Sequence, residues 1–225
     1  IGLRALLTAS GLTEADLQLD EIGYNAPALL CTGRVEAAVI YTANEPVTIR
    51  DQCGDVTVID IWPLADLLAN GLISNERTLA ENPDLVRGMV RALAMGIADT
   101  LADPDAALEI SRGYVEMLPQ GVGRMETSIA AADVLRALSD AAANGEPILP
   151  EQAGVLAASL AGVLDAGEVV QMRVLRNALD LWRADRPGYT DPVSWQVTLD
   201  TLVAAGLLAE PFDLAGAYTN EFLPE

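Results

Sequence analysis

The chain has 225 residues, of which 13 are basic and 33 are acidic, so its formal net charge is −20. Every basic residue is arginine, and histidine is absent. Nucleic acids and anionic membrane surfaces select for basic patches, so this charge argues against both as partners. The lack of histidine removes the commonest general base and a common metal ligand.

The two cysteines, Cys31 and Cys53, are too few and too far apart for a zinc site of the usual paired spacing. They form either one disulfide in an oxidising compartment or two ordinary thiols. The longest apolar run, residues 153–164, is shorter than the roughly 20 residues that cross a bilayer. We therefore expect neither a metal site nor a cofactor. The chain starts without methionine, inside an apparent helix, so we expect that an upstream part has been removed.

The first third of the chain alternates between helical and strand-like segments. Apolar residues at helical spacing predict a helix over residues 3–10, which Gly11 ends. Residues 17–22 alternate as a strand does, and Asn25 is placed to cap a helix over 26–32. Small and β-branched residues predict a buried strand over 35–40.

A helix beginning at Pro46 and a strand over residues 56–61 complete this alternation. Repeated strand and helix units predict an α/β fold with a mostly parallel sheet. A short strand over 72–74 follows. The remainder reads as helical, and the predicted helices cover residues 85–101, 103–117, 128–143, 150–164, 168–183 and 192–205. The change in character predicts a lobe boundary near residues 70–75.

A candidate ligand site follows the predicted strand 35–40. Tyr41, Asn44 and Glu45 lie in the loop that leaves its carboxyl end, and such loops line the ligand crevice of open α/β sheets. Tyr24 and Asn25 leave a neighbouring strand end in the same way. An aromatic face with amide and carboxylate groups suits a pyrimidine ring with an exocyclic amine.

Each of these residues also has a structural interpretation. Glu45 suits the positive end of a helix dipole, and Asn25 suits a simple helix cap. Tyr41 can serve as packing at the end of a strand. Trp62 and Asn70 are secondary candidates for the site, because core and hinge roles explain them equally well.

Several short motifs stand in a characteristic order and spacing: Gly23-Tyr24-Asn25, residues 33–39, Tyr41-Thr42-Ala43-Asn44-Glu45-Pro46, residues 70–76, residues 81–86, residues 103–107 and residues 218–223. Together they resemble the SsuA/THI5-like or NMT1-like family of substrate-binding proteins, and in particular its thiamine-precursor-binding group. They span almost the whole chain, although no single motif is specific.

The resemblance implies a two-lobed fold of the periplasmic binding protein-like type II class, with a helix-rich C-terminal part. Residues 1–70 would be the second lobe, 71–117 would return to the first lobe, and 168–225 would be C-terminal helices on the lobes. Residues 118–167 depart from the family pattern as an atypical helical insertion. The N-terminal part of the first lobe would be missing from this sequence.

The resemblance also implies a function. The protein would be the solute-binding component of an ABC importer, not an enzyme, and it would deliver a thiamine-precursor pyrimidine or a similar heterocycle to a membrane permease. We expect a monomer outside the cytoplasm, either in the periplasm or lipid-anchored on the outer face of the cell membrane, with Tyr24, Asn25, Tyr41, Asn44 and Glu45 binding the ligand.

Three alternatives stay open. The solute could be riboflavin, a sulfonate such as taurine, or nitrate, although anions favour cationic sites or free helix amides over the acid present here. A pyrimidine-precursor synthase shares the fold, but such enzymes depend on histidine, which is absent. A sensor or interaction module without transport activity would use the helical stretch 118–167.

Overall fold

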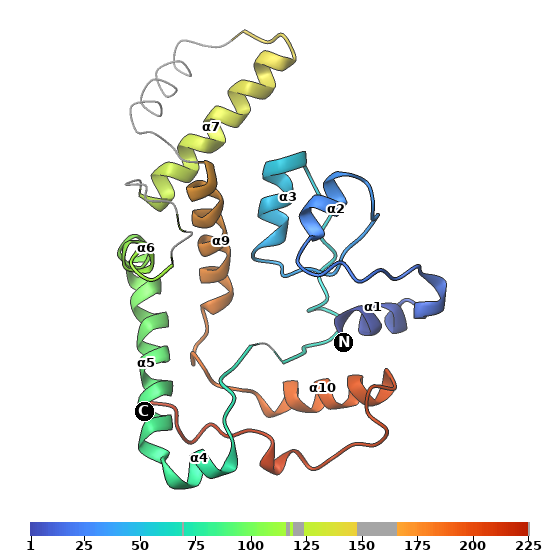
Figure 1. The fold of residues 1–225 in the computed structure, drawn as a ribbon, viewed down its shortest axis with the longest axis vertical. Helices are drawn as coiled ribbons and strands as arrows, with labels where there is room; N and C mark the ends of the chain where they lie inside the picture. The colour runs from blue at the N-terminus through green and yellow to red at the C-terminus, as the bar shows by residue number, and fades with distance from the viewer. Residues whose placement is uncertain (69, 116–117, 119–123, 148–165, 225) are drawn as a thin grey trace. The chain divides into compact units, whose positions relative to one another are not determined.

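A computed structural model describes most of the chain (Figure 1). The described residues are 1–68, 70–115, 118, 124–147 and 166–224. Within them the regular secondary structure is helical, and no described residue belongs to a β-strand.

The chain divides into two compact units that interleave along the sequence. Unit 1 consists of Ile1–Thr42, Asp55–Ile97 and Ala184–Glu225, and unit 2 consists of Ala43–Gly54 and Ala98–Arg183. The boundary between Thr42 and Ala43 falls inside the candidate ligand loop, so the members of that loop belong to different units.

Unit 1 carries short helices joined by long irregular segments. Its helices are α1 (Gly2–Ala9), α2 (Ala26–Cys31), α4 (Glu76–Glu81), the first part of α5 (Pro83–Ala102) and α10 (Pro192–Ala204), with 3-10 turns at Glu14–Asp16 and Leu214–Gly216. Sequence signals fix several of their ends. Gly11, which follows α1, adopts a φ of 70°, a left-handed conformation that suits glycine.

Unit 2 has a helical core. Its helices are α3 (Glu45–Cys53), α6 (Pro104–Arg112), α7 (Met125–Ala143) and α9 (Ala166–Trp182). Helix α9 packs against both α7 and α3. The buried core residues are Leu108, Met125, Ile129, Met172 and Leu179. Apolar residues at helical spacing on several helices thus meet in one cluster.

Capping side chains begin several of these helices. Asp103 accepts a hydrogen bond of 3.0 Å from the Ala106 amide at the start of α6, and Asp191 accepts one of 2.9 Å from Val193 at the start of α10. These starts confirm the helices predicted after each Asp-Pro pair. Helix α4 was not predicted, although Asn75, whose side chain accepts from the Thr78 amide, gives the same signal.

The prediction of strands is not confirmed in the described residues. Segments 17–22, 35–40, 56–61 and 72–74 are irregular, and many of their apolar side chains are open to solvent. Ile59 is 68% exposed and Ile73 is 98% exposed. A strand satisfies its backbone only through a neighbouring strand, so apolar patterning alone does not produce one.

Two helix predictions need comment. The helix predicted over 103–117 is too long, because α6 ends at Arg112 and the chain turns at Gly113, whose amide donates to the Ile110 carbonyl at 3.0 Å. The helix predicted over 150–164 lies outside the described residues. The lobe ranges 1–70, 71–117, 118–167 and 168–225 stay predictions.

Candidate functional site

Arg4 connects α1 to the turn that follows it and to the end of α10. The Arg4 guanidinium on α1 donates to both carboxylate oxygens of Glu14, at 2.7 and 3.1 Å, and to the carbonyl of Ala205 after α10, at 2.9 Å. The hydrogen bond from Arg4 lowers the pKa of the Glu14 carboxyl below its ordinary value. One arginine thereby links the N-terminal helix and the turn that follows it to the end of α10, 201 positions away.

The turn that follows α1 is closed by a second carboxylate. Asp16 accepts hydrogen bonds from the backbone amide of Thr13 at 2.8 Å and from its hydroxyl at 2.9 Å. These bonds to the charged form, with the backbone bond contributing most, lower the pKa of Asp16. The hydrogen bonds of Glu14 and Asp16 thus stabilise the turn that follows α1.

Helix α10 also holds the segment that follows Trp62. The Ser194 hydroxyl donates to the Asp66 carboxylate at 2.7 Å, and the Leu68 amide donates to the Thr198 hydroxyl at 2.9 Å. Both bonds are partly buried. The segment after residue 62 is thus fixed to a helix from the opposite end of the chain.

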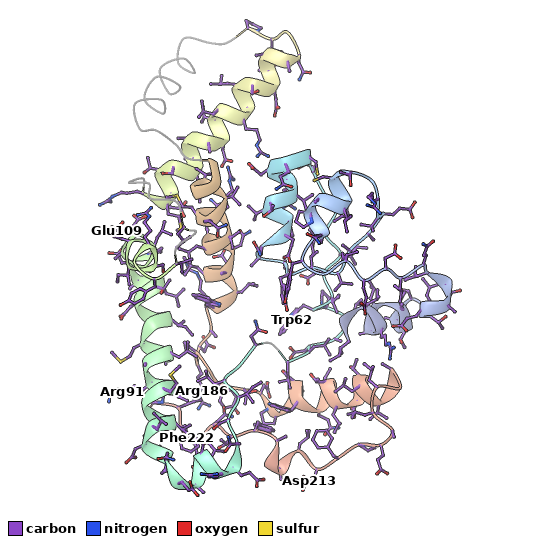
Figure 2. The ribbon with its side chains drawn as sticks, in the orientation of Figure 1. Trp62, Arg91, Glu109, Arg186, Asp213 and Phe222 are labelled. Atoms are coloured by element: carbon purple, nitrogen blue, oxygen red, sulfur yellow. The ribbon has the colours of Figure 1, made fainter. Side chains whose placement is uncertain are left out.

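The C-terminal motif of the family resemblance has a structural role. The Asn220 amide exchanges two hydrogen bonds with the backbone of Thr190, at 2.9 and 3.0 Å, and Trp195 stacks on Tyr218 with ring centroids 4.8 Å apart. The Phe222 side chain, labelled in Figure 2, is 6% exposed. The Arg87 guanidinium lies 5.3 Å from the centroid of the Phe222 ring.

Tyr24 and Asn25 lie at the turn before α2. Tyr24 is 98% exposed. Asn25 occupies the position before the helix, but its side chain makes no capping hydrogen bond. The interpretation of Asn25 as a simple side-chain cap is therefore wrong.

Tyr41 closes the first segment of unit 1 and is 67% exposed. Asn44 and Glu45 begin α3 in unit 2, where Asn44 makes no side-chain cap and Glu45 is the acid of the first turn. Pro46 and Ile49 on the same helix are buried. The packing of α3 therefore fixes the backbone from which Glu45 projects.

The five candidate residues divide between the two units. Tyr24, Asn25 and Tyr41 belong to unit 1, whereas Asn44 and Glu45 belong to unit 2. Their combination into one site stays a prediction. The secondary candidates Trp62 and Asn70 are both exposed, so the core interpretation of Trp62 is wrong.

Three further observations concern the described residues. Both cysteines, Cys31 and Cys53, are disulfide-bonded, which settles the alternative left open by the sequence. The described residues hold no group of three or more potential metal-ligating side chains. None of the described helices has the length and apolar character that a bilayer crossing requires.

Comparison with known proteins places these features in context. Residues 1–107 match the family model described as NMT1/THI5 like. The chain is 33% identical over 227 residues to riboflavin-binding protein RibY of Chloroflexus aurantiacus, and the match covers 99% of this chain. It extends well past residue 107, into the helices of unit 2. The chain spans 52% of that relative's length.

No solved structure matches the chain. The family match and the similar binding protein together support a solute-binding role, and they point to a binding protein more than to an enzyme. The resemblance to the NMT1/THI5-like family is confirmed at the level of the family, because residues 1–107 match its model.

Proposed function

We propose that this protein is the solute-binding component of an ABC importer and that its ligand is a planar nitrogen heterocycle. The observation that supports this most is the match of nearly the whole chain to a riboflavin-binding protein, because it includes the helices beyond the family region. Exposed aromatic and amide side chains at the predicted strand ends suit such a ligand.

Riboflavin is the first ligand to test, and a thiamine-precursor aminopyrimidine is the second. Both are planar rings with edge acceptors and donors, so both need a stacking face and a few polar groups in the ring plane. The similar protein carries riboflavin in its name, and this places riboflavin first.

In this proposal each type of candidate side chain contacts a different part of the ligand. Tyr24 and Tyr41, whose residues are 98% and 67% exposed, would stack on the ligand. Asn25 and Asn44 are not used as side-chain caps, which leaves their amides to meet ring nitrogens and carbonyls. Glu45 accepts a hydrogen bond from a ring N–H or an amino group.

We propose an extracytoplasmic location, in the periplasm or lipid-anchored on the outer face of the cell membrane, with a membrane permease as partner. The disulfide bonding of Cys31 and Cys53 supports this, because disulfides persist in oxidising compartments. The net charge of −20 gives no support to a nucleic-acid partner.

The other candidate functions have weaker support. A sulfonate or nitrate receptor would need cationic groups, and the candidate loop offers Glu45 instead. A synthase of the histidine-dependent type is disfavoured by the absence of histidine. A sensor without a permease would bind the same ligand, so a transport assay in cells that lack the gene distinguishes it.

The proposal is tested by equilibrium binding to the purified protein. Riboflavin, thiamine, the aminopyrimidine and taurine are titrated while the melting temperature is followed, since a ligand that binds the folded state raises it by mass action. We expect a shift with a flavin or a pyrimidine and none with taurine. A shift with taurine alone, or with none of the four ligands, would overturn the proposal.

The role of Glu45 is tested by a matched pair of variants. We expect Glu45→Gln to weaken binding by more than about tenfold, because a carboxylate accepts a stronger hydrogen bond than an amide does. Glu76→Gln is the control, since Glu76 also stands in the first turn of a helix. Equal affinity of the two variants would leave Glu45 with only its helix-end role.

A further inference from the structure

Helix α3 carries two of the five candidate ligand residues, Asn44 and Glu45, at its N-terminal end, but its own sequence stabilises it only weakly. It has nine residues, fewer than the roughly 12–15 that an isolated helix needs in water. Residues 47–49 are valine, threonine and isoleucine, whose branched side chains lower helix propensity. The Asn44 side chain makes no capping hydrogen bond. Contacts with other helices must therefore hold α3 in place.

The Arg136 guanidinium on α7 binds the C-terminal end of α3. Its Nη1 atom donates to the Arg50 carbonyl at 3.1 Å, and its Nη2 atom donates to the Asp51 carboxylate at 3.0 Å. Arg50 lies in the last turn of α3, where the backbone carbonyls of an α-helix lack a partner within the helix. A cation at this end also interacts favourably with the helix dipole. Arg136 therefore acts as a C-terminal cap that another helix supplies.

Helix α7 is itself firmly placed within unit 2. Its residues Ile129 and Leu138 are 1% and 5% exposed, and Ile129 belongs to the buried core cluster. The Asp105 carboxylate on α6 accepts a hydrogen bond of 2.7 Å from the Met125 amide at the start of α7. Helix α9 packs against α7 and against α3. Arg136 thus projects from a helix that the core fixes, and it holds α3 together with α9.

The two hydrogen bonds of Arg136 differ in their expected contribution. The side chains of Arg136 and Asp51 are 46% and 42% exposed, so water screens this ion pair and it contributes little. The bond to the Arg50 carbonyl is charge-assisted and pairs a backbone group at the helix end. We therefore expect the backbone bond, more than the ion pair, to hold the end of α3.

This contact joins two parts of the chain that differ in their relation to the family. Helix α3 lies within residues 1–107, which match the family model, whereas Arg136 lies beyond them. From the sequence, residues 118–167 are expected to be an atypical helical insertion. Residues 125–143 of that stretch form α7, which packs in the core of unit 2 and holds a helix of the family region.

We infer that Arg136 is a positioning residue of the ligand site, which acts through α3 on Asn44 and Glu45 and does not itself contact the ligand. The inference rests on the proposed function and adds to it a residue from outside the family region. A helix of nine residues moves largely as one body, so an unheld C-terminal end also loosens the N-terminal end. Binding groups on a fixed element lose less freedom when the ligand binds, and this increases the affinity.

The test compares two arginine substitutions in the full chain, with riboflavin as the probe. Arg136→Met keeps an apolar stem but removes the donors to α3. Arg176→Met is the matched control, because the Arg176 side chain is 39% exposed and its guanidinium lies 3.8 Å from the carboxylate of Glu126 on α7. We expect Arg136→Met to weaken binding about three- to tenfold, as the loss of one hydrogen bond would, and Arg176→Met to leave it unchanged. Arg136→Lys keeps a charged donor and should restore part of the affinity.

Two further measurements separate positioning from a purely stabilising role. Hydrogen exchange of the α3 amides, without ligand, should be faster in Arg136→Met than in the parent protein and unchanged in Arg176→Met. In a double-mutant cycle with Glu45→Gln, the two effects on affinity should be less than additive, because both act through α3. All affinities are measured well below the melting temperature of each variant, so that every variant is folded.

The outcomes separate the inference from the proposed function. If exchange in α3 is equal in the parent protein and in Arg136→Met, Arg136 does not cap α3 and the inference is wrong. If exchange is faster but riboflavin binds equally well, or if the cycle with Glu45→Gln is additive, Arg136 does not position the site and the inference is also wrong. If the parent protein binds only the aminopyrimidine, the same comparisons are made with that ligand. If neither heterocycle binds the parent protein, the proposed function itself fails, and the positioning role fails with it.

Discussion

The buried cluster of unit 2 and the irregular segments of unit 1 differ in the exposure of their apolar side chains. In unit 2, Ile129 and Met172 are 1% and 0% exposed, and they lie in one cluster between helices. In unit 1, Ile59 and Ile73 are 68% and 98% exposed, although their segments are equally apolar in sequence. The difference follows from the backbone, because a helix satisfies its own hydrogen bonds and needs a neighbour only for its apolar face.

Helix pairs in unit 2 gain some additional contacts at their surfaces. Arg173 and Arg176 both lie on α9. Arg173 pairs with Asp133 on α7, and the Arg176 guanidinium lies 3.8 Å from the carboxylate of Glu126, which is also on α7. In each pair the acid is more than half exposed, so the pair adds little stability. Burial of apolar side chains is the main stabilising contribution there.

The substitution with the largest expected effect on stability removes a buried side chain from unit 2. We expect Met172→Ala to lower the free energy of unfolding by about 2–5 kcal/mol, because it leaves a cavity in a fully buried cluster. Chemical denaturation followed by circular dichroism measures the change. Leu181→Ala on the same helix, where the side chain is 66% exposed, should change it by less than about 0.5 kcal/mol.

Equal effects of these two substitutions would mean that α9 is not held through its buried face. The contrast between a packed helical unit and a unit with open apolar segments would then fail.

A smaller effect is expected in unit 1, where hydrogen bonds hold the irregular segments. Ser194→Ala removes the donor to Asp66, and we expect a loss of about 1 kcal/mol in the free energy of unfolding. Hydrogen exchange of the amides at residues 66–68 should increase, since Ser194 and Thr198 hold this segment to α10.

Gln196→Ala is the matched control for this substitution. Gln196 lies on the same helix, and its side chain donates to Asp200 of that helix. If hydrogen exchange at residues 66–68 is also faster in the control variant, protection of these amides depends on α10 as a whole and not on the Ser194 hydroxyl.

The smallest expected effect concerns pH. The folded-state pKa values of Glu14 and Asp16 are lowered by hydrogen bonds from Arg4 and Thr13, so both carboxylates stabilise the folded state when ionised. This contribution is complete above the ordinary carboxyl pKa of about 4 and is lost as the pH falls through the lowered values.

Melting temperatures of the parent protein and of Glu14→Gln between neutral and acidic pH measure this effect. The variant should melt at a lower temperature at neutral pH, and its melting temperature should approach that of the parent in acid. A constant difference at every pH would contradict the assignment to the Glu14 carboxylate.

Much of the helical structure could be predicted from the sequence. The Asp103-Pro104 and Asp191-Pro192 pairs predicted two helix starts, and both aspartates cap their helices. The end of α6 was missed because the residues after Arg112 continue the same composition, and only the turn at Gly113 stops the helix. Helix α4 was missed because a six-residue helix carries little periodicity.

The residues of the candidate site could be chosen from the sequence, but their exposure and hydrogen bonding could not be predicted. Tyr24, Asn25, Tyr41, Asn44 and Glu45 were chosen because polar and aromatic residues follow apolar segments. Neither the exposure of Tyr24 nor the absence of a cap at Asn25 could be read from that pattern. Trp62 was left undecided, because an indole suits a core and a ligand site equally well.

The sequence by itself determined most of the helices, the helix starts at Asp103 and Asp191 and the family motifs, because these depend on residues a few positions apart. Only the tertiary structure decided which apolar residues are buried, which carboxylates are held by Arg4 or Ser194, and which tryptophan is left in water. Those properties depend on partners up to 201 positions away in the chain, as for Arg4 and Ala205, and no local pattern specifies them.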